Sequence, residues 1–134
     1  MEFNFSGKSV LVTGSTRGIG KEIGKEFFNK GAEVVFNGRS LDSLIAITKE
    51  LNIKKDYGIN ADVTNCFQAE KLVKDAERLM NKIDIIVCNV GSGKSVKPGQ
   101  ENYKEWHKVF NENFLSATNI VEAGKLALKK TKGN

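Results

Sequence analysis

The stretch VLVTGSTRGIG, residues 10–20, contains the strongest structural signal in this sequence. It joins a short aliphatic run to three closely spaced glycines, Gly14, Gly18 and Gly20. Such a run is typical of a β-strand covered on both faces, and glycines directly after it permit a tight turn into a helix. The N–H groups of the turn and the helix dipole then favour bound phosphate groups. The stretch predicts a strand, a turn and a helix, and the open question is whether the turn holds a ligand.

The same alternation continues along the chain. Apolar runs predict strands at residues 9–13, 33–37, 56–60 and 83–88. Apolar residues at helical spacing predict helices between these strands, and a last long helix is predicted at about residues 102–129. Asp42 and Asn65 occupy N-cap positions, and Gly31 follows the first helix as a C-terminal glycine. Right-handed connections turn this order into an α/β, doubly wound parallel sheet.

Composition indicates a globular protein without membrane-spanning segments. Hydrophobic residues make up 40% and charged residues 28% of the 134 residues, and no apolar run approaches the ~20 residues of a membrane helix. No signal peptide is recognised, so a cytoplasmic location is predicted. The net charge is +5, but the lysines are scattered along helices, so nucleic-acid binding is not expected. Cys66 and Cys88 are the only two cysteines, their spacing does not suggest a metal site, and they are predicted to be reduced and buried.

The glycine spacing carries a family resemblance. Thr13, the three glycines and Ile19 give T-G-x-x-x-G-I-G, and every fixed position of this turn resembles the short-chain dehydrogenase/reductase family. The resemblance continues with Asp62-Val63 after the third strand, where the family places an Asp beside the adenine ring. It implies a Rossmann-type fold with strand order 3-2-1-4, one NAD(P)-binding domain over residues 1–134, and a dinucleotide cofactor.

Two further segments resemble family motifs. In CNVG, residues 88–91, the family usually has N-N-A-G; Asn89 and Gly91 match, whereas Cys88 and Val90 do not. The resemblance therefore implies the loss of a structural Asn that ties the central strands. In WHKVFNEN an Asn lies seven residues after Trp106, as in the family's fourth helix, and this is Asn113.

The resemblance assigns residues to the cofactor and to catalysis. The predicted cofactor-binding residues are Gly14, Ser15, Thr16, Arg17, Gly18, Ile19, Gly20, Arg39, Ser40, Asp62, Val63, Asn89 and Gly91. Asn113 is implied to hold a water in the proton relay. It is also the one amide in the otherwise apolar stripe Trp106, Phe110, Ala117, Val121, which predicts a buried amide that needs partners. A satisfied core Asn is the alternative.

The residues near the second strand bear on the choice of dinucleotide. An NAD site places a carboxylate about 20 residues past the glycines to bind the ribose 2′-OH, but Gly38 stands there. Arg39 follows, and Arg17 lies within the turn. Two guanidinium groups would pair with a 2′-phosphate, and Ser40 could add a hydroxyl, so NADP is predicted. The alternative is that both arginines are ordinary surface residues.

Two rival functions are disfavoured. GSGKS, residues 91–95, resembles the end of a phosphate-binding P-loop, but that motif needs a glycine at position 88, which is Cys88. Pro98-Gly99 also follows too soon for the required helix. A methyltransferase would want an acidic residue near Gly38. An oxidoreductase with an unidentified carbonyl or alcohol substrate is therefore favoured.

The family's catalytic Ser and its Tyr-x-x-x-Lys pair are not found. Tyr57 is followed four residues later by Ala61, and Tyr103 by His107. We therefore expect the cofactor-binding half of an oxidoreductase, ending before its fifth strand and inactive alone. A standalone dinucleotide-binding module and one half of a split enzyme remain alternatives. Self-association through the open sheet edge or the last helix is also expected.

Overall fold

The computed structural model describes residues 3–134 of the chain. Helices and strands alternate along most of it, as the apolar pattern predicts. In chain order the elements are β1 (Ser9–Val12), α1 (Gly18–Asn29), β2 (Glu33–Gly38), α2 (Leu41–Glu50), a 3₁₀ turn (Lys55–Tyr57), β3 (Gly58–Asn60), α3 (Cys66–Met80), β4 (Ile85–Val87), α4 (Tyr103–Phe110), a π-helical turn (Asn111–Leu115) and α5 (Ser116–Thr131).

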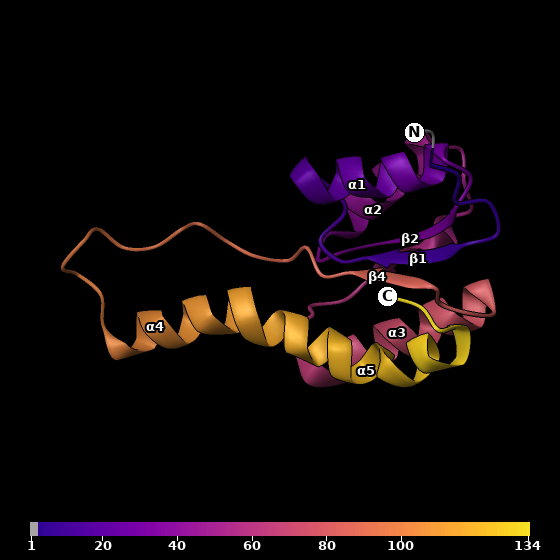
Figure 1. Cartoon of the computed structure of the whole chain (residues 1–134). Coiled ribbons are helices and arrows are strands. Elements are labelled where there is room, and N and C mark those ends of the chain that lie inside the picture. Colours follow the sequence, from indigo (N-terminus) through magenta and orange to yellow (C-terminus); the bar gives the residue numbers. More distant parts are fainter. Residues whose placement is uncertain (1–2) are drawn as a thin grey trace.

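The described strands form a parallel sheet in the order β3-β2-β1-β4. Helices α1 and α2 cover one face, and α3 and α5 cover the other (Figure 1). The doubly wound fold and the strand order are therefore as predicted. The order reverses between β1 and β4, because β2 and β3 lie on one side of β1 and β4 on the other.

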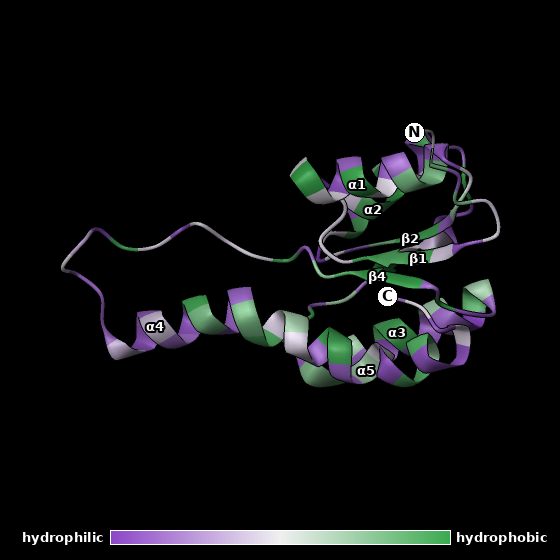
Figure 2. Cartoon of the chain, in the orientation of Figure 1, coloured by the Kyte–Doolittle hydropathy of each residue, from purple (hydrophilic) through white to green (hydrophobic). Residues whose placement is uncertain are grey.

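Alternation along the strands builds two cores. Val10 and Val12 face α1 and α2, where the ring of Phe36 is fully buried between them and the helices. Leu11, between them in sequence, faces α3 and α5 and packs with Ile120. The strands are accordingly apolar on both faces, whereas hydrophilic and hydrophobic turns alternate along the covering helices (Figure 2).

The helix ends follow the predicted chemistry with one correction. Asn65 caps α3 by accepting the N–H of Gln68, and Gly31 takes φ +90° directly after α1, as predicted. The prediction for Asp42 was wrong. Ser40 caps α2 by accepting the N–H of Ser43, and Asp42 lies in the first helical turn, where its charge favours the helix dipole.

The predicted last helix is interrupted by a π-helical turn over Asn111–Leu115. The side-chain amide of Asn113 donates to the carbonyl of Val109 at 3.0 Å. This is the carbonyl that the backbone N–H of Asn113 would use in a regular α-helix, so the side chain competes with the backbone there. The apolar spacing continues through this turn, so the sequence pattern does not reveal that the backbone hydrogen bonds change from the α-helical to the π-helical spacing.

Helix α4 and the segment before it extend away from the sheet (Figure 1). Its apolar side chains are exposed: Tyr103 is 80%, Trp106 65% and Phe110 54% accessible. Figure 2 shows these hydrophobic turns on α4 with no other element against them. The predicted burial of the stripe that contains Asn113 was therefore wrong, because within the described residues no sheet or helix lies opposite it.

Both cysteines are exposed, so their predicted burial was wrong as well. Cys66 is the first residue of α3, on the solvent side of its N-terminal turn. Cys88 follows the last residue of β4, a strand with a neighbour on one side only over most of its length. Apolar runs of sequence do not distinguish a strand inside a sheet from one at its edge.

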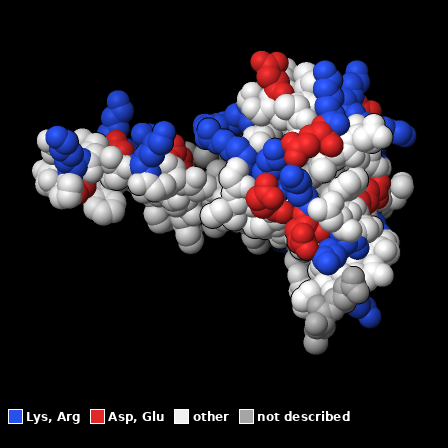
Figure 3. All heavy atoms as spheres, turned by 90° about the horizontal axis from the view of Figure 1, so that it is seen from above, with Lys and Arg blue, Asp and Glu red and all other residues white. Residues whose placement is uncertain are grey.

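Charges of both signs are interspersed on the α1 and α2 side of the molecule, rather than gathered in one basic patch (Figure 3). Lys21 and Lys25 of α1 both donate to Glu50 of α2, at 2.7 and 2.9 Å. These two hydrogen bonds lower the pKa of Glu50 to about 2. In residues 3–134 no helix is long and apolar enough to cross a bilayer, and no cluster of metal-ligating side chains occurs.

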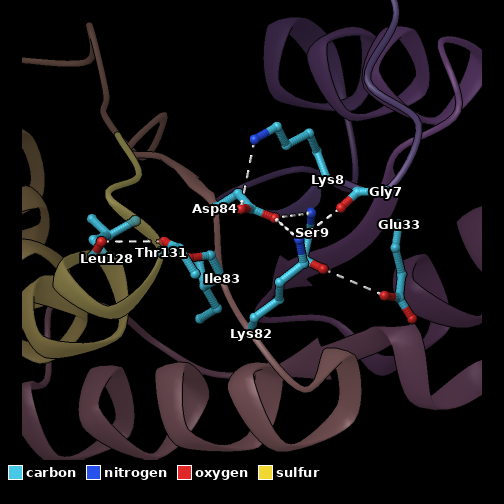
Figure 4. A network of polar contacts seen from close by, with 9 residues as sticks. All are labelled: Gly7, Lys8, Ser9, Glu33, Lys82, Ile83, Asp84, Leu128 and Thr131. Carbon is cyan, nitrogen blue, oxygen red and sulfur yellow. Dashed lines mark hydrogen bonds and ion pairs between the residues drawn. The ribbon is translucent and has the colours of Figure 1, made fainter.

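A buried carboxylate joins the amino ends of the central strands (Figure 4). Asp84 is 5% exposed and accepts the backbone N–H of Ser9 at 2.9 Å. Lys82 lies 2.9 Å and Lys8 3.8 Å from its carboxylate oxygens. Burial alone would raise the pKa of Asp84, but the hydrogen bonds from Lys82 and Ser9 and the two lysine charges outweigh it and lower the pKa.

Replacing Asp84 by Ala is expected to destabilise the fold by about 1–3 kcal/mol near neutral pH, since the buried Ser9 N–H loses its partner. The folded-state pKa of Asp84 lies below that of the unfolded chain. Its contribution is therefore present above about pH 4 and is lost as the pH falls through the folded pKa. Urea unfolding at neutral and acidic pH measures this. The exposed Asp56→Ala is the control, and a difference for Asp84→Ala that does not shrink in acid would contradict the assignment.

Candidate functional site

The predicted site residues gather at one edge of the sheet. Each segment follows the carboxyl end of a strand: the glycine turn follows β1, Arg39 and Ser40 follow β2, Asp62 follows β3, and Asn89 follows β4. In open α/β sheets ligands bind at this edge, at the point where the strand order reverses. That point lies between β1 and β4, directly beside the glycine turn.

The backbone of the turn requires its glycines. Gly14 and Gly18 have φ values of +60° and +55°, in the left-handed region that side chains disfavour. Gly20 is required by space instead. A Cβ atom there would lie 2.2 Å from Nδ2 of Asn89 and 2.4 Å from the carbonyl oxygen of Gly14. The first turn of α1 thus packs directly against the residues that follow β1 and β4.

Asn37 holds the turn in place, although it is not among the residues that the sequence predicts for the site. Its side chain is 1% exposed; Oδ1 accepts the N–H of Gly14 at 3.3 Å, and Nδ2 donates to the carbonyls of Ile59 and Ala61. Ser15 donates its backbone N–H to the carbonyl of Asn37 and its hydroxyl to that of Val12. The sequence does contain a signal for this role: Asn37 is the one amide in the apolar run VVFNG, and a buried amide needs hydrogen-bond partners.

Asn89 ties the two central strands. Its Nδ2 donates to the carbonyls of Thr13 and Gly14, at 3.1 and 3.0 Å, and its backbone N–H donates to the hydroxyl of Thr13. The resemblance implied that a structural Asn is lost at Cys88. In the structure the strand ends are nevertheless joined, by Asn89 and by the Thr13 hydroxyl, which donates to the carbonyl of Val87 at 3.2 Å.

The N-terminus of α1 is open to an anion. Arg17 occupies the N-cap in an extended conformation without a side-chain cap, and the first turn contains no acidic residue. Arg17 is exposed, and Ile19 is 77% exposed beside it. The N–H groups of this turn therefore keep the capacity to bind a negatively charged group, which the helix dipole favours.

The end of β2 is shaped by Thr16. A Cβ on Gly38 would lie 2.7 Å from Cγ2 of Thr16, so any side chain at this position would require Thr16 to move. Arg39 comes next, and its side chain is 72% exposed. Ser40 is exposed at the N-cap of α2. The edge beside the glycine turn thus presents guanidinium and hydroxyl groups at the end of β2, and no carboxylate from β2 itself.

After β3, the two predicted residues differ in their surroundings. Asp62 is partly exposed, and one carboxylate oxygen lies 3.9 Å from Nη1 of Arg39. Val63 is 2% exposed and packs in the core formed with α3 and α5. Asn119 of α5 donates to the carbonyl of Val63 at 3.0 Å. The side chain of Val63 is therefore not available to a ligand, and Asp62 is.

Asn113 is exposed but not without partners. Its Oδ1 accepts the N–H of Ser92 at 2.8 Å, and its Nδ2 donates to the carbonyl of Ser92 at 3.0 Å. It thereby fixes the chain just after Gly91, on the β4 side of the site. The two segments lie 21 residues apart in sequence, and their pairing was not predicted.

Comparisons with known proteins agree with this geometry. The chain is 30% identical over 131 residues to L-fucose dehydrogenase of Rattus norvegicus, covering 97% of this chain and 48% of that protein. It is 30% identical over 129 residues to the 3-oxoacyl-[acyl-carrier-protein] reductase FabG of Aquifex aeolicus, covering 94% of this chain and 52% of that protein. The chain thus spans about half the length of these curated relatives.

A solved structure described as a Pseudomonas aeruginosa RhlG/NADP active-site complex superposes with a TM-score of 0.87 and 25% identity. The match covers 97% of this chain and 51% of that one. The family model described as short chain dehydrogenase matches residues 8–134. With the glycine turn, the strand order and this match together, the chain belongs to the short chain dehydrogenase family.

Proposed function

We propose that this chain is the NADP(H)-binding portion of a short chain dehydrogenase. The observation that carries the proposal is the end of β2, where Gly38 packs closely on Thr16 and no acidic side chain is present. Arg39 follows with a largely exposed guanidinium group. A guanidinium suits a 2′-phosphate, whereas a ribose 2′-OH is best bound by a carboxylate.

The residues of the site divide between the parts of the cofactor. The glycine turn and the uncapped N-terminus of α1 would bind the pyrophosphate. Arg17, Arg39 and Ser40 would bind the 2′-phosphate, and Asp62 would lie beside the adenine. The nicotinamide supplies the hydride. Asn89 and Gly91 would line its ribose side, and Asn113, through Ser92, would hold that side in place.

Replacing Arg39 by Ala is expected to weaken NADPH binding about tenfold and to leave NADH binding unchanged. Losing one charge-assisted hydrogen bond costs about 1.5–3 kcal/mol, and the exposure of Arg39 favours the lower figure. Calorimetric titration of the chain and the variant with both cofactors measures the effect. Lys49→Ala serves as the control, because Lys49 is also exposed and lies on α2, the helix that follows Arg39. Equal affinity of the unmodified chain for NADPH and NADH would refute the assignment of NADP.

The chain itself is proposed to bind cofactor without turning over a substrate. The chain spans about half of its relatives, so a cofactor-binding portion describes it better than a whole enzyme. Two alternatives also have this chain bind the cofactor. In the first it acts alone as a dinucleotide-binding module, and in the second a separate polypeptide completes the enzyme. The substrate, a carbonyl or alcohol compound, and the cytoplasmic location stay predictions from the sequence.

Self-association is proposed as a consequence of the open edge. On the edge of β4 that faces away from β1, the backbone bonds of the described residues are to Asn134, at Ile86 and at Asp84 just before the strand. The aromatic side chains of α4 are exposed. Light scattering at rising concentration is expected to show dimers or larger species, and Trp106→Ala with Phe110→Ala to reduce them. Phe67→Ala, on α3 and 78% exposed, is the control. A monomer at every concentration would exclude this proposal.

A further inference from the structure

Asp62 presents a carboxylate whose orientation is fixed. Its Oδ1 accepts the backbone N–H of Thr64 at 3.0 Å and the hydroxyl of Thr64 at 2.7 Å. Its own N–H donates to Oε1 of Gln68 at 2.8 Å. One carboxylate oxygen is therefore engaged in a local turn, and the other, Oδ2, is held outward at the carboxyl end of β3.

The free oxygen faces Arg39. Strands β2 and β3 are parallel neighbours, with Gly38 opposite Asn60, so the residues just beyond them lie side by side. Nη1 of Arg39 is 3.9 Å from Oδ2 of Asp62, and the two side chains are 72% and 36% exposed. The guanidinium is the mobile partner of the pair, since the carboxylate is tied to Thr64.

We propose that Asp62 is a specificity-determining residue that competes with the 2′-phosphate of NADP for Arg39. This inference rests on the proposed function, in which Arg39 binds that phosphate. The second cofactor, NAD, has a hydroxyl in place of the phosphate and does not need the guanidinium. The carboxylate therefore weakens NADP binding selectively and limits the preference between the two cofactors.

The size of the effect follows from the exposure of the pair. Exposed ion pairs are weak, so breaking this one on NADPH binding costs about two- to fivefold in affinity. Because the pair is at the surface, dissolved salt screens it, and the effect shrinks as ionic strength rises. Arg17 is not paired with Asp62, so the competition concerns Arg39 alone among the two arginines of the site.

The test is Asp62→Asn, which keeps an oxygen for Thr64 and removes the charge. Dissociation constants for NADPH and NADH are measured by titration for the chain and the variant at low and high salt. The ratio of the NADH to the NADPH constant is expected to rise about two- to fivefold at low salt. Asp56→Asn is the matched control: it makes the same change in net charge at an exposed position before the amino end of β3. Its ratio should not change.

The same substitution in an Arg39→Ala background separates competition from direct repulsion. If Asp62 acts by occupying Arg39, the Asp62→Asn gain in the ratio is lost when Arg39 is absent. An unchanged or lower ratio in Asp62→Asn, or an equal gain in both backgrounds, would overturn the inference. Any loss of adenine contacts affects both cofactors alike and cancels in the ratio.

The experiment also separates this inference from the proposed function. If the unmodified chain does not prefer NADPH, or Arg39→Ala leaves its affinity unchanged, the assignment of NADP fails. If the preference depends on Arg39 but Asp62→Asn does not increase it, only the role of Asp62 fails. The two results come from the same titrations.

Discussion

NADPH bound to this chain is expected to persist unoxidised in the presence of ketones, aldehydes and other carbonyl compounds. A bound nicotinamide presents a hydride, but reduction also needs a proton donor at the carbonyl oxygen. General acid–base catalysis of this kind contributes about 10²–10⁴-fold. We therefore expect NADPH oxidation, followed by absorbance, to stay at the rate of a cofactor-only blank over a broad panel of substrates.

The described tyrosines do not supply the proton donor. Tyr57 lies before β3, at the amino end of the sheet and away from the site, and its hydrogen bond to Glu33 raises its pKa to about 12. Tyr103 begins α4, 80% exposed, with its ring against His107. Asn113 is bonded to Ser92 and can position a neighbour, but an amide is neither an acid nor a base near neutral pH.

A rate clearly above the blank would contradict this prediction if it were lost in Asn113→Ala or Tyr103→Phe. The reductase of Aquifex aeolicus that matches this chain is a suitable positive control for the assay. The comparison is meaningful only with cofactor bound, so the NADPH titration is made first on the same preparation.

Replacing Gly20 by Ala is expected to reduce NADPH affinity about a hundredfold or more and to destabilise the fold. The added Cβ would lie 2.2 Å from Nδ2 of Asn89 and 2.4 Å from the carbonyl of Gly14. The second contact is with backbone, so the turn itself must move. Overpacking of this kind costs about 1–3 kcal/mol of stability. Displaced N–H groups would lose two or more charge-assisted bonds to the pyrophosphate, each worth about 1.5 kcal/mol or more.

Gly93→Ala is the matched control, because a Cβ at Gly93 meets nothing within 4 Å. Its effect on urea unfolding and on NADPH titration should be within error of the unmodified chain. A Gly20→Ala variant that binds NADPH normally would show that the first turn of α1 does not hold the pyrophosphate. A variant that unfolds readily but binds at low temperature with normal affinity would count against the prediction in the same way.

Much of the fold follows from local patterns in the sequence. A continuous apolar run places Val10, Leu11 and Val12 in a strand buried on both faces, and the glycines after it require a turn into a helix. Right-handed connections between such units lead to a parallel sheet. The family resemblance supplied its order, 3-2-1-4, which the structure has. The strand and the turn depend on residues close in sequence, which is why the sequence alone predicts them, whereas the strand order does not.

The sequence by itself determined the strands and the glycine turn, because these follow from spacing over a few residues, and right-handed connections between such units imply that the sheet is parallel. Only the tertiary structure decided which polar groups meet across the carboxyl edge. These contacts join segments 22 to 76 residues apart in sequence: the bonds of Asn37, the bonds of Asn89 and the Arg39–Asp62 pair. Arg39 and Asp62 meet because they follow neighbouring strands, whose register sets the distance between the two side chains. Exposure was likewise decided there: Cys88 and Trp106 are apolar by type, but a side chain is buried only where another element packs against it.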